Sequence, residues 1–229
     1  MSGPLRHRAP RGDPYAGIPG RRLFVGVPLP QDATAAVAEV VERVRATTLA
    51  PGARDVRWVR LDGLHLTIRF LGPTPTERID PTAEAVLQVA RAFRGPIDVE
   101  LGRAGTFPSG RRPRALWIGL TEGAETLTEL ALAMEAALAD VGWPPVDRPF
   151  RPHLTLARSD GVASGALVGD RLVAVMADRR IRFRVDRVGL YESVTGGGPA
   201  RYVPVMLGGL GETPADGSSV YNPTTPDPL

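Results

Sequence analysis

The tripeptide His-Leu-Thr occurs twice in this chain, at residues 65–67 and 153–155, and it limits the possible folds more than any other feature. Each copy opens a run in which polar and apolar residues alternate, HLTIRFLG and HLTLARSD. Because successive side chains of a β-strand point to opposite faces, such a run predicts a strand with one buried face. The fold must therefore contain two strands, 88 residues apart in the sequence, with the same face pattern.

Within each predicted strand the histidine and the threonine share a face. His65 and Thr67 lie on one side, and the apolar residues at positions 66, 68 and 70 lie on the other. His153 and Thr155 repeat this arrangement. A single copy would fit a strand histidine without a chemical role, but two matched copies, in a body with no other histidine, favour a shared site.

Apolar periodicity predicts short strands alternating with helices that carry one apolar stripe. Asp80 with Pro81, and Thr126 with Glu129, are the residue pairs expected to open two of these helices. This order of elements predicts an α+β fold with helices packed over sheets. The expected strands are 22–29, 56–59, 64–71, 97–101, 115–120, 153–157, 182–191 and 201–207, and the expected helices are 32–46, 80–93, 126–141 and 166–177.

The charge of the chain does not identify a partner. All 28 basic residues are arginine, and the formal net charge is +3. The first 22 residues carry five arginines against one aspartate, so the rest of the chain is close to neutral. Bulk charge therefore does not predict binding of nucleic acid.

The sequence contains no cysteine, which excludes disulfides, thiolate metal sites and cysteine nucleophiles. No run approaches the roughly 18 apolar residues that a membrane helix needs, and the first residues lack the apolar core of a signal peptide. We expect a disordered basic arm at 1–21, one folded domain at 22–207 and a disordered tail at 208–229. A cytoplasmic monomer without a membrane partner fits these features.

Two histidines and two threonines supply a specific chemistry. Imidazoles with a pKa near 6.5 can act at neutral pH as one base and one acid, and threonine hydroxyls can donate hydrogen bonds to the oxygens of an anion. That set suits displacement at a phosphate diester. A metal site would need further ligands near the motifs, and a serine hydrolase would need a Gly-x-Ser-x-Gly turn, which is missing.

The paired motif resembles the 2H phosphoesterase superfamily, specifically the RNA 2′,3′-cyclic phosphodiesterases that were formerly called 2′-5′ RNA ligases. The resemblance extends over about residues 22–207. It includes RLFVGVPLP at 22–30, DGLHLTIRFLG at 62–72, the RPF-x-PH pattern at 148–153 and RYVP at 201–204.

The resemblance implies a bilobal fold, in which two pseudo-symmetric lobes of antiparallel sheet with outer helices surround a central cleft. It implies hydrolysis of RNA 2′,3′-cyclic phosphate ends to 2′-phosphomonoesters, without a metal or another cofactor, and action on small cyclic nucleotides. His65 would be the proton donor and His153 the proton acceptor. Thr67, Thr155 and Arg158 would bind the phosphate.

The sequence also predicts where Arg158, Arg69, Trp117 and the loop 103–114 lie. Arg158 is in phase with the core face, so its use in the site requires the strand to end or to bulge before it. Arg69 shares the phase of His65, but it lies four residues along the strand, and we expect it in solvent or at the cleft rim. Trp117 is expected in the core. The loop 103–114, with four arginines and Phe107, is either a substrate contact or a solvated loop.

Two alternatives remain open from the sequence. In the first, the same site acts on ADP-ribose cyclic phosphate, 2′-5′-linked oligonucleotides or another small cyclic phosphodiester. Alternatively, the protein binds or ligates RNA ends, a function to which the near-neutral body is poorly suited. The near symmetry of the motifs does not decide which histidine is the acid.

Overall fold

A computed structural model describes residues 18–47, 56–159, 161, 164–196 and 199–212. Within them, nine strands form one antiparallel sheet in the order β7-β4-β5-β6-β3-β1-β8-β9, with β2 paired to β6. The strands are β1 (Arg21–Pro28), β2 (Arg57–Trp58), β3 (His65–Thr74), β4 (Ile97–Phe107), β5 (Ala115–Glu122), β6 (His153–Arg158), β7 (Ile181–Val185), β8 (Arg187–Val194) and β9 (Arg201–Gly209). The helices are α1 (Gln31–Thr47), α2 (Ile79–Ala92), α3 (Ala124–Asp140) and α4 (Ser164–Met176), with short 3-10 turns η2 (Leu61–Gly63) and η3 (Thr76–Arg78).

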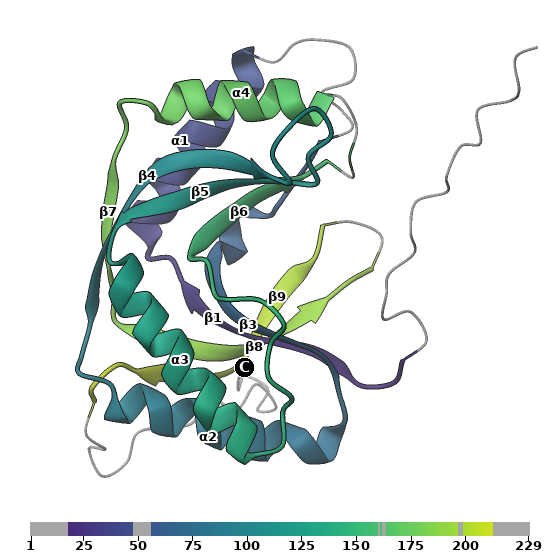
Figure 1. The fold of residues 1–229 in the computed structure, drawn as a ribbon, viewed down its shortest axis with the longest axis vertical. Coiled ribbons are helices and arrows are strands. Elements are labelled where there is room, and N and C mark those ends of the chain that lie inside the picture. The colour runs from purple at the N-terminus through teal and green to yellow at the C-terminus, as the bar shows by residue number, and fades with distance from the viewer. Residues whose placement is uncertain (1–17, 48–55, 160, 162–163, 197–198, 213–229) are drawn as a thin grey trace, which may run out of the picture.

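The sheet curls so that its two halves face each other across a central opening (Figure 1). We call β7, β4, β5 and β6 the β6 lobe; α1 and α4 cover its outer side. We call β3, β1, β8 and β9 the β3 lobe; α2 and α3 cover it. Each lobe has four strands and two helices, and each contains one His-Leu-Thr strand. The α+β class and the bilobal arrangement are confirmed.

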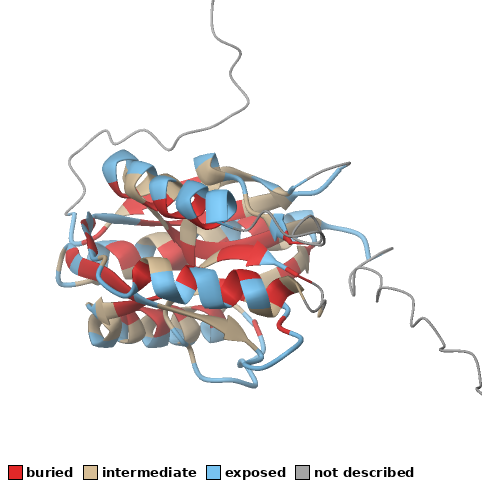
Figure 2. Cartoon of the chain, turned by 90° about the horizontal axis from the view of Figure 1, so that it is seen from above, coloured by how far each residue is buried: buried red, intermediate tan, exposed pale blue. Residues whose placement is uncertain are grey.

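Helix burial follows the predicted stripes. In α1 the four valines at positions 37, 40, 41 and 44 are buried, while Glu39 and Glu42 on the other side are exposed. Figure 2 shows the same division along the helices, with buried residues toward the sheet and exposed residues outward. The apolar residues of both lobes join into one continuous core, which fixes the lobes as a single body.

The lobes meet where β3 pairs with β6, and a single pair of residues, Leu66 and Leu154, forms that ladder. Both leucines are fully buried. No further ladder pair joins the two strands in the described residues. The seam therefore holds the two motifs together and leaves their polar faces open to the central cleft.

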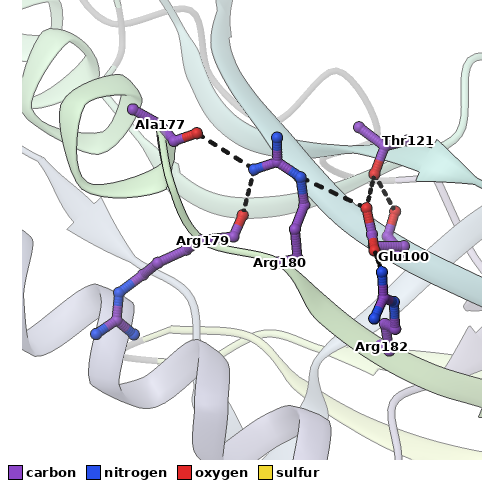
Figure 3. Close-up of polar contacts among 6 residues, drawn as sticks. All are labelled: Glu100, Thr121, Ala177, Arg179, Arg180 and Arg182. Atoms are coloured by element: carbon purple, nitrogen blue, oxygen red, sulfur yellow. Dashed lines mark hydrogen bonds and ion pairs between the residues drawn. The ribbon is translucent and has the colours of Figure 1, made fainter.

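A buried carboxylate links the strands at the outer edge of the β6 lobe (Figure 3). Glu100 of β4 accepts a hydrogen bond from Thr121 of β5 at 2.7 Å and forms an ion pair with Arg182 of β7 at 2.7 Å. The Thr121 hydroxyl and the neighbouring arginines hold the pKa of the Glu100 carboxyl below its ordinary value. A charged carboxylate thus ties three strands together.

Several predicted boundaries are wrong in detail. Helix α2 begins at Ile79 after the turn η3, so Asp80 and Pro81 lie inside its first turn. No side chain caps this helix. Helix α3 begins at Ala124, so Gly123, with a φ of 80°, is the N-cap in place of Thr126, and no side chain caps the helix. The stretch 182–191 contains parts of two strands, β7 and β8.

The described residues include both edges of the predicted domain. Strand β1 begins at Arg21, and β9 continues to Gly209. The predicted arm and tail otherwise fall on residues 1–17 and 213–229, outside the described residues. No helix within the described ranges combines the length and the apolar character needed to cross a membrane.

Candidate active site

The Leu66–Leu154 pair places the two motifs side by side. When the antiparallel register is extended by one residue in each direction, His65 lies opposite Thr155 and Thr67 lies opposite His153. Directly opposed residues in such a ladder have Cα atoms about 5 Å apart. Because the leucines point into the core, the four polar side chains point to the other face. The fold thus places His65, Thr67 and Thr155 on one cavity, whereas His153, on the same strand face as Thr155, is not among the residues that line it.

A bulge follows each motif. Between β1 and β3 the register passes from Gly26↔Thr67 to Val25↔Arg69, which leaves Ile68 without a partner. Between β5 and β6 it passes from Trp117↔Thr155 to Leu116↔Ala157, which leaves Leu156 without a partner. An extra residue reverses the face pattern beyond it. The fifth residue after each histidine therefore reaches the cleft face.

Those fifth residues are Arg158 on β6 and Phe70 on β3. The bulge that the sequence required for Arg158 is present, and the side chain lines the same cavity as His65, Thr67 and Thr155. Phe70 lines this cavity too, with 63 % of its surface exposed, so its predicted place on the core face is wrong. In the pseudo-symmetry of the lobes, Phe70 is the counterpart of Arg158.

The prediction that Arg69 lies in solvent or at the cleft rim is wrong. Its side chain is buried, with 6 % of its surface exposed. The same bulge turns it away from the cleft. Its guanidinium donates hydrogen bonds to both carboxylate oxygens of Glu135 on α3, at 2.9 and 3.0 Å, and to the carbonyl oxygen of Pro144. Arg69 therefore ties β3 to helix α3 and to the segment that follows it.

Each catalytic candidate is held by a carbonyl two residues before it. The Nδ1 atom of His65 lies 2.7 Å from the Gly63 oxygen, and that of His153 lies 2.6 Å from the Arg151 oxygen. Since a carbonyl only accepts hydrogen bonds, Nδ1 must carry the proton in both rings. In the neutral histidines this leaves each Nε2 as the basic nitrogen.

His65 lies in an aromatic enclosure. The ring of Phe24 is 4.5 Å away between centroids, that of Tyr202 is 4.6 Å away and edge-on, and that of Tyr191 is stacked at 6.5 Å. This burial lowers the pKa of His65 from its ordinary 6.5, partly offset by the hydrogen bond to Gly63. Burial also raises the pKa of Tyr202, so its phenol stays neutral.

His153 has a different neighbourhood. Phe107 meets it edge-on at 5.2 Å, and Trp117 lies 6.5 Å away between ring centroids. Burial lowers the pKa of His153, and the positive charge of Arg158 lowers it further. Trp117 is partly exposed on the cleft side and lies over Gly105 and Gly119, where a Cβ atom would approach its ring to 2.6 and 2.9 Å. Its predicted place in the core is therefore wrong.

The cavity between the lobes has a volume of about 380 Å³. Among the described residues, its lining contains one imidazole, three threonine hydroxyls and two guanidinium groups, and no acidic side chain. None of the arginines of the loop 103–114 lines it, and Phe107 of that loop packs against His153. In the part of the chain that the structure describes, no three His, Cys, Asp or Glu side chains gather as metal ligands would. The lining suits a small anion held beside the imidazole of His65.

Phe70 is the site residue that the sequence reasoning placed wrongly. A signal for it existed in the spacing, because Phe70 and Arg158 are each the fifth residue after a motif histidine. A bulge after the second motif brings Arg158 to the cleft, and the same bulge after the first motif would bring Phe70 there.

Comparisons with known proteins agree with this geometry. The RNA 2′,3′-cyclic phosphodiesterase of Geobacillus stearothermophilus is 35 % identical over 136 residues, which cover 59 % of this chain and 41 % of that protein. The enzyme of the same name from Methanocaldococcus jannaschii is 25 % identical over 179 residues, 78 % of this chain and 95 % of that protein. A crystal structure of E. coli LigT complexed with 3′-AMP matches with a TM-score of 0.61 and 27 % identity, covering 84 % of this chain and 99 % of that chain.

A family model extends over most of the folded body. It describes the 2′-5′ RNA ligase superfamily and matches residues 29–197, a range that contains both motifs, both bulges and Arg158. The match includes the strand pair at which the lobes meet. By sequence and by fold, this chain belongs to the 2′-5′ RNA ligase superfamily.

Proposed function

We propose that the protein is an RNA 2′,3′-cyclic phosphodiesterase that opens the cyclic phosphate to a 2′-phosphomonoester. The observation that carries the proposal is the pairing of the two His-x-Thr strands at Leu66 and Leu154, with Nδ1 of each histidine held by a carbonyl. The names of the Geobacillus and Methanocaldococcus relatives support the same activity. The protein is proposed to act as a cytoplasmic monomer.

In the proposed reaction the phosphorus lies between the two imidazoles. Neutral His153 takes a proton from a water molecule through Nε2 while the water oxygen attacks phosphorus. The bond from phosphorus to the ribose 3′ oxygen breaks, and protonated His65 gives its Nε2 proton to that oxygen. The products are a 2′-phosphomonoester and a free 3′ hydroxyl. Base and acid stand on opposite sides of the phosphorus, as an in-line displacement requires.

The remaining polar groups bind the charge. Thr67 and Thr155 donate hydrogen bonds to the two non-bridging oxygens, and the guanidinium of Arg158 balances their negative charge. The assignment of His153 as the base is supported by its surroundings, because Arg158 disfavours its protonated form. His65 has no such cation among the causes of its shifted pKa. A bound phosphate anion would stabilise the protonated form of His65.

Product analysis tests the function directly. With adenosine 2′,3′-cyclic phosphate we expect adenosine 2′-phosphate alone, identified by chromatography against the 3′ isomer. Because the imidazoles and hydroxyls supply the acid, the base and the anion contacts, treatment with EDTA should leave the rate unchanged. Formation of the 3′-phosphate, or loss of turnover on chelation with recovery on adding a divalent metal, would contradict the proposal.

The pH dependence follows from the lowered pKa values. In kcat/KM one histidine must be neutral and the other protonated in the free protein. Burial lowers the pKa of both below 6.5, so the bell-shaped profile of kcat/KM should have its maximum below pH 6.5. Above that pH activity falls as the acid loses its proton. A kcat/KM that still rises between about pH 7 and 9 would be inconsistent with this site.

A further inference from the structure

A second groove begins where the cleft ends, on the far side of Phe70. It has a volume of about 250 Å³ and lies between helix α3, strand β3 and the segment 143–152. In Figure 1 this segment runs from the end of α3 past β3 to β6. Phe70 lines both the cleft and the groove, so the two cavities lie on either side of one aromatic side chain.

The groove exposes apolar surface that a folded protein normally covers. Phe70 is 63 % exposed, Leu132 of α3 is 65 % exposed and Val146 is 47 % exposed. Half-buried Phe150 adds a second aromatic ring to the lining. An apolar groove with exposed aromatic rings suits flat ligands, and nucleic-acid bases stack on such rings without regard to sequence.

The charges of the groove favour an anion. Its only acidic lining residue is Glu135, and the two hydrogen bonds from Arg69 neutralise that carboxylate. Arg148 also lines the groove, is exposed, and makes no ion pair with any described residue. One guanidinium therefore remains available for a phosphate. Aromatic rings combined with free positive charge are typical of surfaces that bind single-stranded nucleic acid.

A further cavity of about 400 Å³, on the other side of His65, has different charges. Asp62 and Asp186 line it together with Arg184 and Arg187, and Arg187 forms an ion pair with Asp186. Asp62 is paired with Arg60 in the same way, so the carboxylates of this cavity are balanced by arginines. The groove beyond Phe70 differs from this cavity in the exposed apolar side chains of Phe70, Leu132 and Val146, which make it the more favourable surface for a base.

We propose that this groove holds the nucleotide that precedes the cyclic phosphate end, so that the preferred substrate is an oligonucleotide. This inference rests on the proposed function. The terminal nucleoside lies in the cleft, the strand passes over Phe70, and the next base lies against the apolar wall formed by Leu132, Val146 and Phe150. Arg148 contacts the phosphate that joins the two nucleotides.

The test compares two substrates with the same end, adenosine 2′,3′-cyclic phosphate and the dinucleotide ApA 2′,3′-cyclic phosphate. The second base should raise kcat/KM about tenfold in the unaltered protein. R148A and L132D should each remove most of this advantage, and turnover of the mononucleotide should stay within about twofold. Matched controls are R184A, in the cavity beside His65, and L167D, at an exposed leucine of α4 on the other lobe.

The outcomes separate the two proposals. Equal kcat/KM for both substrates, equal losses on both substrates in R148A and L132D, or loss of the dinucleotide advantage in R184A would overturn the groove. If the unaltered protein turns over neither substrate, the proposed function fails, and calorimetric binding of the two 2′-phosphate products then tests the groove alone. Tighter binding of the dinucleotide, weakened in L132D and not in L167D, would support it; equal binding would overturn it.

Discussion

Replacing His153 with alanine should lower kcat/KM for adenosine 2′,3′-cyclic phosphate by about 10²- to 10⁴-fold, and replacing His65 should do the same. Each substitution removes a proton-transfer group from one displacement step. The carbonyl contacts at Gly63 and Arg151 leave each ring one nitrogen, Nε2, for that step. Initial rates over a range of substrate concentrations measure the effect.

The double variant makes the test sharper. Because both histidines serve the same step, the double variant H65A/H153A should be only slightly less active than the less active of the two single variants. His7, the third histidine of the sequence, provides the matched control, and H7A should keep full activity. Circular dichroism should show all variants folded. Turnover in H65A or H153A within about tenfold of the unaltered protein would refute the acid and base roles.

Replacing Arg69 with methionine should lower the free energy of unfolding by about 3 kcal/mol. The Arg69 guanidinium is buried against Glu135, whose side chain is 25 % exposed, so its removal leaves a carboxylate that is largely withdrawn from water. It also removes the contact that holds the segment after α3 against β3. Urea denaturation measures the change as a shift of the midpoint at constant slope.

Two controls separate this pair from an ordinary surface ion pair. In R69M/E135L the stranded carboxylate is gone as well, and most of the lost stability should return. Arg94 forms an ion pair with Glu129 with both side chains exposed, so R94A should cost less than about 1 kcal/mol. An R69M variant as stable as R94A would show that the buried pair does not hold α3 in place.

The sequence predicts the local pattern of the site well, and long-range pairing decides the rest. The two motifs give the strands, the buried leucines and the face shared by His65 and Thr67. They do not give the bulges at Ile68 and Leu156, because the register of β3 depends on β1 and that of β6 on β5. Each bulge changes which side chain reaches the cleft two residues later.

The wrong predictions share this cause. The burial of Arg69 depends on Glu135, which is 66 positions away in the chain. The start of α2 at Ile79 depends on burial of that side chain, which favoured an earlier first turn than Asp80 would set. The placement of Trp117 depends on glycines of two strands. In each case a tertiary contact overrode a correct local preference.

The exchange of segments between the lobes has a consequence for folding. The chain enters the β3 lobe with β1, supplies α1 to the β6 lobe, returns with β3 and α2, and crosses again for β4 and β5. Neither lobe is a continuous segment, so no single cut releases one half with its strands and helices complete. We expect one cooperative unfolding transition and slow folding governed by non-local contacts. The two-fold likeness of the lobes thus describes the arrangement around the cleft, whereas the folding unit is the whole body.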